Sequence, residues 1–284
     1  MKCKIQHPIQ IFKEVTMKVL LINGSPHKEG CTYTALKEVA DTLEANGIKT
    51  EMMYLGVKPI AGCIACGNCQ KTGKCFVDDR VNEFIAKLPE IDGIVLGSPV
   101  YYAGASGQIT SFLDRAFFAG SGKFEGKLGA AVVSCRRGGA SATFDQLNKY
   151  FTMNSMPVVS SQYWNQVHGF TPDDVRQDLE GMQTMRTLAN NMAWLLKCIA
   201  LGKKQGIEMP DTEEKILNFL VLRSMKPEGK KILKIKMEDL ASLIDETRIN
   251  VSKVLNDLQE QGLVQLSRKE ISIPALEKLT EKNK

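Results

Sequence analysis

Residues 17–32 read MKVLLINGSPHKEGCT, a short aliphatic run followed by a glycine-containing turn. Lys18–Ile22 predicts a buried strand, and apolar residues at helical spacing after Cys31 predict a helix. The alternation continues to about residue 201, with strands expected at 50–55, 93–97, 130–134 and, more weakly, 158–160. Strands that alternate with helices form right-handed βαβ crossovers. The sequence therefore predicts an α/β domain at residues 17–203, with a doubly wound parallel sheet of five strands.

The turn between the first strand and the first helix has the composition of a phosphate site. A helix N-terminus carries unpaired N–H groups and a partial positive charge. Glycine lets the backbone approach a ligand, and hydroxyl groups donate to phosphate oxygens. The spacing matches neither GxGxxG nor GxxxxGK[ST], so an ordinary strand-to-helix turn stays open as the alternative. The residues predicted at this site are Ser25, His27, Gly30, Cys31 and Thr32.

Two later strands end in loops that suit a flat ligand. Residues 97–104 read GSPVYYAG, and residues 134–140 read SCRRGGA. Ligand crevices of open α/β sheets lie at such carboxyl ends. Tyrosines beside a rigid Pro-Val edge suit an aromatic ring, and a glycine-rich turn offers free N–H donors, although either tyrosine alone is as consistent with packing. The predicted contacts are Pro99, Val100, Tyr101, Tyr102, Cys135, Arg136, Gly138 and Gly139.

Four of the 8 cysteines are clustered in the spacing C-x-x-C-x-x-C-x5-C, at Cys63, Cys66, Cys69 and Cys75. Four thiolates hold a [4Fe–4S] cluster, and a compact set of this kind fits around one. Zinc sites more often separate two CxxC pairs by a longer stretch. Zinc, a dithiol redox pair and a metal-free loop all stay open as alternatives. Asp78 and Asp79, just downstream, predict a helix cap.

The whole chain has ordinary globular composition, with 43% hydrophobic and 24% charged residues and a net charge of +5. No apolar run approaches the roughly 20 residues that span a bilayer, and the first sixteen residues are too polar for a signal peptide. Clustered cysteines without an export signal indicate metal or redox chemistry rather than disulfides. We therefore expect a cytoplasmic protein with no membrane partner. Residues 1–16 form an N-terminal arm without an assigned function.

A second domain is predicted at residues 211–284, after a linker at 204–210. Helical patterns at 211–225, 237–244 and 247–261, with a strand at 231–235 and a hairpin at 263–273, have the order of a winged helix. The second helix of the pair would enter the major groove of DNA, and the hairpin tip would contact phosphates. The residues expected to contact DNA are Thr247, Arg248, Ile249, Ser252, Lys253, Arg268 and Lys269.

The charge of this second domain is balanced. Residues 206–284 hold 14 basic and 14 acidic residues. Because DNA binding depends on neutralising phosphates, a balanced domain leaves dimerisation or protein binding open as an alternative use of the same fold. If the domain binds DNA, we expect a homodimer, since such readers usually pair on two half-sites.

Several of these stretches resemble one known family. Gly24–Pro26, Gly97–Tyr101, Gly107–Gln108 and Asp114–Arg115 are similar to the NADPH-dependent FMN reductase branch of the flavodoxin-like superfamily, over about residues 17–201. The resemblance implies non-covalent FMN, hydride transfer from NAD(P)H to the flavin, frequent dimers and no essential acid–base side chain. It places Ser25, Gly30 and Thr32 at the phosphate, residues 99–102 beside the isoalloxazine and the turn after Cys135 near the pyrimidine. Cys31 stands where relatives often have Asn, and Asp114–Arg115 is interpreted as structural.

Two further resemblances extend the interpretation. The cysteine spacing is similar to that of the iron–sulfur flavoproteins, in which a cluster relays single electrons from ferredoxin to FMN. Residues 211–276 resemble the DNA-binding domain of the cyclic-AMP receptor/fumarate-nitrate regulator family, without its nucleotide-binding barrel. Ile249 stands where relatives often carry a base-reading polar residue, and Asp245 and Glu246 add repulsion.

Together the resemblances imply an FMN-dependent NAD(P)H oxidoreductase that acts as a redox-responsive DNA-binding regulator. Two alternatives stay open. One is an iron–sulfur flavoprotein that passes electrons from ferredoxin to FMN, and the other is a flavin-sensing transcription regulator with little turnover. A simple electron carrier like flavodoxin is disfavoured, because such carriers are usually acidic single domains and this chain is basic.

Overall fold

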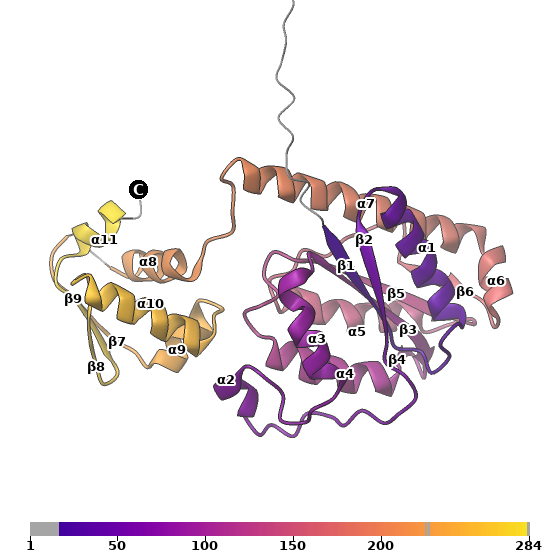
Figure 1. Cartoon of the computed structure of the whole chain (residues 1–284), viewed down its shortest axis with the longest axis horizontal. Coiled ribbons are helices and arrows are strands. Elements are labelled where there is room, and N and C mark those ends of the chain that lie inside the picture. The colour runs from indigo at the N-terminus through magenta and orange to yellow at the C-terminus, as the bar shows by residue number, and fades with distance from the viewer. Residues whose placement is uncertain (1–16, 225, 227, 283–284) are drawn as a thin grey trace, which may run out of the picture.

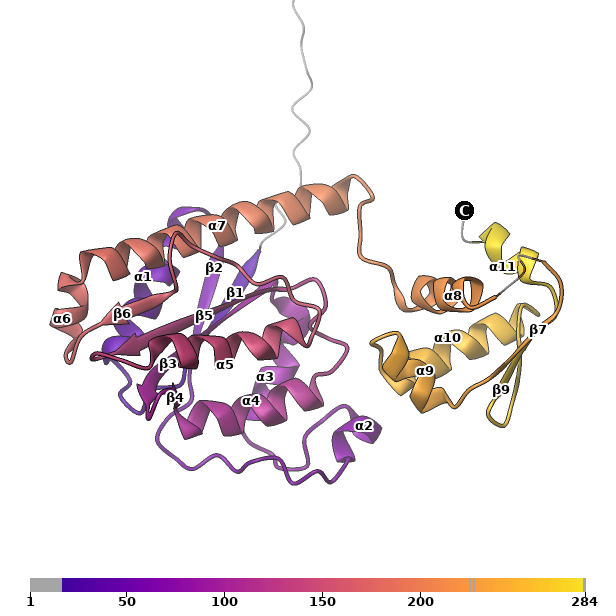
Figure 2. The same cartoon turned by 180° about the vertical axis from the view of Figure 1, so that it is seen from behind.

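The computed structural model describes residues 17–224, 226 and 228–282. It contains an α/β domain and a smaller domain of short helices and strands, joined after one long helix (Figures 1 and 2). The predicted arm at residues 1–16 lies outside the described residues. The two predicted domains are thus present, and the segment between the last helix of the first and the first helix of the second covers residues 205–211.

The α/β domain has a parallel sheet in the order β2-β1-β3-β5-β6. Its strands are β1 (Lys18–Asn23), β2 (Lys49–Tyr54), β3 (Gly93–Tyr101), β5 (Leu128–Cys135) and β6 (Gln166–His168). A two-residue strand, β4 (Gly104–Ala105), pairs antiparallel with the end of β3. The chain passes from β2 across β1 to β3, so the direction of winding reverses between β1 and β3. This confirms the predicted doubly wound, five-stranded parallel sheet and places its switch point at the first two loops of the predicted site.

Helices cover both faces of the sheet. One face carries α1 (Cys31–Ala45), α6 (Pro172–Gln177) and α7 (Leu179–Lys204), and the other carries α3 (Arg80–Lys87), η1 (Leu88–Glu90), α4 (Gly107–Ala119) and α5 (Ala140–Thr152). Successive β1 residues alternate between two cores: Val19 and Leu21 pack toward α1 and α7, and Leu20 and Ile22 pack toward α3 and α4. Burial on both faces explains why these strands are continuously apolar rather than alternating.

The fifth strand is not where the sequence predicted it. Residues 158–160 form only an isolated bridge, between Val158 and Gly129 at the start of β5. The chain then loops outward through residues 161–165 and pairs again with the far end of β5 as β6, at Gln166–His168. Both segments pair with β5, so the prediction at 158–160 found the correct neighbouring strand but the wrong residues.

The helical segment that follows β6 is divided into α6 and α7. Thr171 caps α6 and forms a reciprocal capping box with Asp174. Asp178 then ends α6 and caps α7 by accepting from the Gly181 N–H at 3.0 Å. Its second oxygen accepts from the His168 N–H at 2.7 Å, which ties the break to β6. One carboxylate therefore satisfies two backbone donors at a bend that periodicity alone did not reveal.

The second domain has the predicted winged-helix order. It comprises α8 (Thr212–Leu222), β7 (Lys231–Lys234), α9 (Met237–Leu243), α10 (Arg248–Glu260), β8 (Gln265–Ser267) and β9 (Glu270–Ile273), with the strand order β7-β9-β8. Leu240, Val251 and Leu255 are buried at its centre, as expected for packing between α9 and α10. A final helix, α11 (Leu276–Lys282), was not predicted and adds Leu276 and Leu279 to this core.

Candidate functional site

The turn after β1 is held open by its own side chains. The Asn23 side chain accepts from the Ser25 N–H at 3.0 Å and donates to the Lys28 carbonyl at 3.1 Å. The Ser25 hydroxyl accepts from the His27 N–H at 3.1 Å. These bonds shape the loop without using the first turn of α1, which begins at Gly30 with no side-chain cap.

Two helices that begin at the carboxyl edge of the sheet share this uncapped start. Both α1, at Gly30, and α5, at Gly139, have a glycine cap and no side-chain bond to the first turn. Side chains cap α3, α4, α6, α7, α8 and α10, whereas α9 and the short helix α2 (Asn68–Thr72), which do not begin at this edge, also lack a side-chain cap. An uncapped helix N-terminus is a site for an anion or for a hydrogen-bond acceptor. The edge thus offers two such starts, and the placement of the phosphate and pyrimidine ends of FMN there stays a prediction.

The turn between β3 and β4 is strained. Tyr102 and Ala103 are non-glycine residues with positive φ, at 50° and 59°. Two such residues make the tight hairpin loop that matches the twist of the flanking strands, at a cost in backbone energy. In this turn Tyr102 is fully exposed and Tyr101 is half-exposed. Both tyrosines are therefore free of core packing and available to a ligand ring.

The loops after β3 and β5 touch one another. A Cβ added to Gly139, which has a φ of 88°, would meet the Ala103 Cα at 2.8 Å and the Val100 Cγ1 at 3.0 Å. Gly139 thus allows the uncapped start of α5 to approach the strained turn. The structure brings together the predicted residues Pro99–Tyr102 and Gly138–Gly139.

Ser106 joins the loops on either side of the switch point and was not predicted. It is buried, its hydroxyl donates to the Gly24 carbonyl at 2.7 Å, and its N–H donates to the Ser98 hydroxyl at 3.0 Å. The same hydroxyl accepts from the Ile109 N–H and caps α4. Its position just before an apolar helical repeat was a cap signal in the sequence, but the long-range bond to Gly24 had none.

Some predicted residues lie beneath the surface of the site. Thr32 is 1% exposed, and its hydroxyl is 2.8 Å from that of Ser134, between α1 and β5. Burial raises the pKa of the Cys31 thiol, which donates to the Gly169 carbonyl at 3.9 Å. Burial likewise raises the pKa of the Cys135 thiol. These residues therefore support the loops from below, while His27 and Arg136 are exposed above them.

A fourth segment, residues 168–170, adjoins this edge and was missed by the sequence. The His168 Nδ1 lies 3.4 Å from the Cys135 Sγ, and the Arg136 guanidinium lies 5.7 Å from the centre of the Phe170 ring. Phe170 is 77% exposed. The segment borders the loop after β5 only because β6 pairs with the end of that strand.

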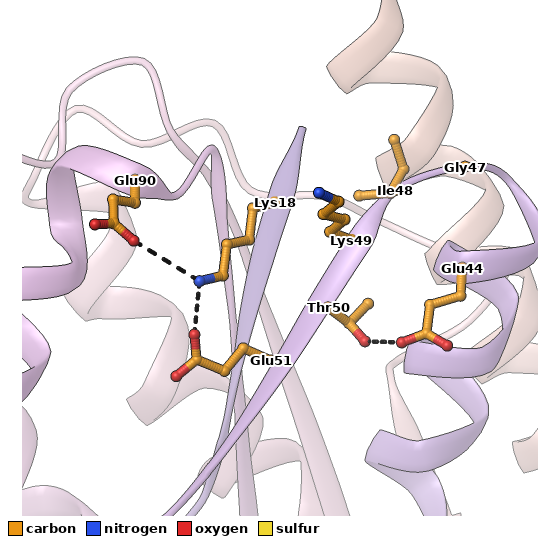
Figure 3. A pocket seen from close by; sticks show the side chains of 8 residues that line it. All are labelled: Lys18, Glu44, Gly47, Ile48, Lys49, Thr50, Glu51 and Glu90. Atoms are coloured by element: carbon orange, nitrogen blue, oxygen red, sulfur yellow. Dashed lines mark hydrogen bonds and ion pairs between the residues drawn. The ribbon is translucent and has the colours of Figure 1, made fainter. Parts of the chain in front are cut away.

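A hollow also lies at the opposite edge, at the amino ends of β1 and β2 (Figure 3). Its charges satisfy one another: Lys18 pairs with Glu51 at 2.7 Å and with Glu90 at 4.0 Å, and Lys87 pairs with Glu51 at 2.8 Å. Ligands of open parallel sheets bind at the carboxyl edge, so we assign this hollow no function.

The four clustered cysteines line one small, mostly apolar hollow beside the C-terminal part of α4. Cys63 and Cys66 are exposed there, whereas Cys69 and Cys75 are half-buried. A short helix, α2 (Asn68–Thr72), separates Cys66 from Cys75, and Phe76 and Phe118 line the same hollow. Burial raises the pKa of the Cys69 thiol.

Among the residues that the structure describes, no three cysteine, histidine or acidic side chains are close enough to hold a single metal ion. A [4Fe–4S] cluster makes a different demand, because each of its irons takes its own cysteine sulfur around a cube. The hollow is lined by four thiols, which is the number and kind of ligand that such a cluster takes.

Arg115 reaches this hollow from α4. Its guanidinium is buried, forms a two-pronged ion pair with Asp79 at 2.6 and 3.0 Å, and donates from Nε and Nη2 to the Cys75 sulfur at 3.3 and 3.2 Å. Asp79 also caps α3, as predicted, by accepting from the Val81 N–H. The sequence interpretation of Arg115 as structural was therefore incomplete, because its position beside a cysteine depends on tertiary packing.

The predicted DNA-contacting residues lie on one domain. Arg248, Ile249 and Lys253 are exposed on the N-terminal half of α10, and Ser252 and Thr247 are half-buried there. Arg268 and Lys269 are exposed at the tip of the β8–β9 hairpin, where Lys269 has a φ of 61°. The structure thus brings the predicted helix and wing together in one small domain.

The same domain contacts the loop after α4. Lys215 pairs with Glu125 of the α/β domain and, at 3.2 Å, with Glu246. A Cβ added to Gly122 would lie 3.0 Å from the Thr247 Cγ2, so the cap of α10 rests against this loop. In both views α2 lies on the side of the α/β domain that faces the winged helix (Figures 1 and 2).

Comparison with known families supports both domains. Residues 17–171 match the family described as NADPH-dependent FMN reductase. Residues 214–282 match the Crp-like helix-turn-helix domain. Among the described residues, no helix combines the length and hydropathy needed to cross a membrane.

The individual proteins that this chain resembles agree with the match to the flavin family. The chain is 37% identical to an iron-sulfur flavoprotein of Methanocaldococcus jannaschii over 64% of its own length and 99% of that protein. It is 28% identical to an iron-sulfur flavoprotein of Methanosarcina thermophila, over 64% of its length and 97% of that protein. Among solved structures, RosB with a bound formylriboflavin phosphate intermediate superposes with a TM-score of 0.56 at 12% identity, over 74% of this chain and 89% of that one, which supports the fold.

Proposed function

Because the chain belongs to the NADPH-dependent FMN reductase family and carries a Crp-like helix-turn-helix domain, it is a flavoprotein oxidoreductase, and we propose that it takes its electrons from NAD(P)H. The observation that supports FMN binding is that the turns after β1, β3 and β5 adjoin at the carboxyl edge of the sheet, where α1 and α5 have uncapped starts. The family match supports NAD(P)H as the electron source. When bound, FMN would supply hydride and single-electron chemistry.

The protein's own residues would bind and orient the cofactor. The first turn of α1 would donate N–H groups to the phosphate, and Ser25 would keep that turn open through its bond to His27. Residues 99–102 would lie along the ring, and the turn at 136–139 would donate N–H groups to the pyrimidine edge. No acid–base side chain is required by this arrangement.

A second proposal concerns the cysteine hollow. We propose that Cys63, Cys66, Cys69 and Cys75 hold a [4Fe–4S] cluster that accepts single electrons from a ferredoxin-like donor. Two features support this proposal. All four thiols line one hollow, and the chain is similar to proteins named iron-sulfur flavoproteins over nearly the full length of those proteins. Under this proposal, NAD(P)H and ferredoxin are alternative electron sources for the same flavin.

The third proposal is redox-responsive regulation through DNA. The loop against Thr247 directly follows α4, and α4 carries the Arg115 guanidinium that contacts Cys75. Only α4 and the loop after it lie between the cysteine hollow and the start of α10, so a redox change at the cysteines has a short route to that helix. Since Thr247 is covered in the described arrangement, the domain would have to separate from the loop to seat α10 fully in a major groove. We also propose a homodimer, which would place two such helices on two half-sites.

Anaerobic purification followed by flavin, iron and sulfide analysis tests the first two proposals together. FMN with about four irons per chain supports the cluster, and FMN without iron would reject it while leaving the reductase. Reduction of the bound flavin by NADPH, NADH or reduced ferredoxin then identifies the donor. For the third proposal, a library of double-stranded DNA is selected against oxidised and reduced protein, and equal affinity in both states would reject redox control.

A further inference from the structure

We propose that Arg115 is a positioning residue for the cysteine hollow, which fixes Cys75 as a cluster ligand and raises the reduction potential of the cluster. The inference rests on the proposed [4Fe–4S] site. It concerns a residue that approaches the hollow from a different element, α4, about forty positions away from the cysteine loop in the sequence.

The first observation is that a permanently charged group has been buried at this point. The Arg115 side chain is 1% exposed, whereas its partner Asp79 is 28% exposed. Arginine does not deprotonate in proteins, so burial has to be compensated by hydrogen bonds at nearly every N–H. Such a group is expensive to bury unless its surroundings are built around it.

The second observation is that the hydrogen bonds that compensate for burial of the Arg115 guanidinium are accepted by the cysteine loop. Besides the ion pair with Asp79, the guanidinium donates to the Ala61 carbonyl at 3.3 Å and to the Val77 carbonyl at 3.0 Å. These carbonyls lie on either side of the four cysteines. One planar group therefore clamps both ends of the loop to α4.

The third observation is that two N–H groups, from Nε and Nη2, are aimed at one sulfur, that of Cys75. The backbone of Cys75 is held independently: its N–H donates to the Asn82 side chain at 2.8 Å, and its carbonyl accepts from that side chain at 3.0 Å. Cys75 is thus held in both its main chain and its side chain by other residues of this chain, whereas Cys63 and Cys66 are exposed.

These contacts have a defined effect on a bound cluster. Hydrogen bonds to cluster sulfurs and nearby charge are among the factors that set the reduction potential. Because reduction adds negative charge, N–H donors at a ligand sulfur favour the reduced state. Asp79 offsets the net charge of Arg115 but does not remove the two N–H dipoles. Removal of these donors should therefore lower the potential and weaken the hold on iron.

The test uses anaerobically purified full-length protein and three variants. Arg115→Lys keeps the charge but cannot supply the fork of donors. Arg115→Gln with Asp79→Asn removes both charges together, so that no unpaired carboxylate is left behind. Arg186→Gln, which removes an exposed arginine paired with Glu38 on the other face of the sheet, is the control for removal of an ion pair.

The readouts are iron per FMN, the rate of iron loss to a chelator and the midpoint potential of the cluster followed by its spectrum. We expect the FMN content of all three variants to match that of wild type. The FMN content reports whether the protein is folded. Both Arg115 variants should lose iron at least tenfold faster. Where cluster remains, we expect the ratio of reduced to oxidised cluster at a fixed potential to be tenfold lower. For one electron this corresponds to a midpoint potential about 59 mV lower.

The outcomes separate this inference from the proposed function. Wild-type protein that contains FMN but no iron would reject the cluster, and with it this inference. A wild-type cluster whose iron retention and potential are unchanged in both Arg115 variants would reject the inference alone. Loss of FMN together with iron would show that Arg115 supports the whole domain rather than the cluster, and would also reject it.

Discussion

The hydroxyl of Ser155, in the loop after α5, donates a 2.8 Å hydrogen bond to the carboxylate of Asp245, in the turn that precedes α10. This bond connects the α/β domain to the winged helix two residues before the helix cap Thr247. Together with the Lys215–Glu125 ion pair, it places the start of the recognition helix against the α/β domain.

Gly122→Ala should loosen the contact between the domains. Gly122 has a φ of 74°, and the added Cβ would lie 3.0 Å from the Thr247 Cγ2. A side chain in this backbone region costs about 1 kcal/mol, and the contact adds crowding. We expect faster proteolysis of the 205–211 linker and tighter binding to DNA.

Gly47→Ala is the matched control for that prediction, because Gly47 has a φ of 79° and a Cβ there would meet nothing within 4 Å. It carries the same backbone strain without a contact between domains. If the linker of both variants is cleaved at the same rate, the domains do not dock through Gly122 in solution.

Gly139→Ala should weaken FMN binding by about tenfold, which corresponds to about 1.4 kcal/mol. The substitution strains a φ of 88° and drives a methyl into Ala103 and Val100, so the turn after β3 has to move away from the flavin site. Fluorescence titration of free FMN measures the dissociation constant. Gly47→Ala is the control, since it strains a similar φ of 79° at the opposite edge of the sheet and a Cβ there meets nothing within 4 Å. Equal affinities of the two variants would contradict a role for this loop contact in binding.

Removing the charges at the wing tip should reduce the salt dependence of DNA binding. Arg268→Gln with Lys269→Asn removes two exposed cations, and asparagine tolerates the left-handed backbone at position 269. The slope of log K against log salt should fall by about 1 for each phosphate that the wing no longer neutralises. Lys278→Ala, at an exposed position of α11, is the charge control. A slope that changes no more than in this control would show that the wing does not contact phosphates.

Glu51→Gln should destabilise the protein at neutral pH but not in acid. Hydrogen bonds from Lys18 and then Lys87 lower the pKa of the Glu51 carboxyl. A carboxyl with a lowered folded pKa stabilises the fold above its unfolded pKa and loses this effect as pH falls through the folded value. Because the group is partly solvated, we expect less than about 1 kcal/mol at pH 7.

Urea unfolding at pH 7, 5 and 3 measures the Glu51 effect. The difference between wild type and Glu51→Gln should shrink as the pH falls, because protonation of the wild-type carboxyl removes the ion pairs that the variant already lacks. Asp145→Asn, at an exposed position of α5, controls for the change in net charge. A difference that persists at pH 3 would assign the effect to packing rather than to the ion pairs.

The sequence by itself determined what depends on local order. Apolar runs such as Lys18–Ile22 are buried on both faces of the sheet, and their alternation with helices limits the topology to right-handed crossovers. The glycines of the turn after β1, the spacing from Cys63 to Cys75 and the cap at Thr247 are likewise short-range signals. They were sufficient to predict the fold and the winged-helix domain, and the loops proposed for the flavin site follow from the same signals.

Tertiary structure alone decided what depends on residues distant in the chain. The fifth strand lies at Gln166–His168 because that segment meets the end of β5, and residue periodicity carries no information about a partner strand. Ser106 reaches Gly24, and Arg115 reaches Cys75, only because α4 packs beside the switch point at one end and the cysteine loop at the other. Contacts of this kind arise from packing between elements, so their energy appears only once the chain is folded.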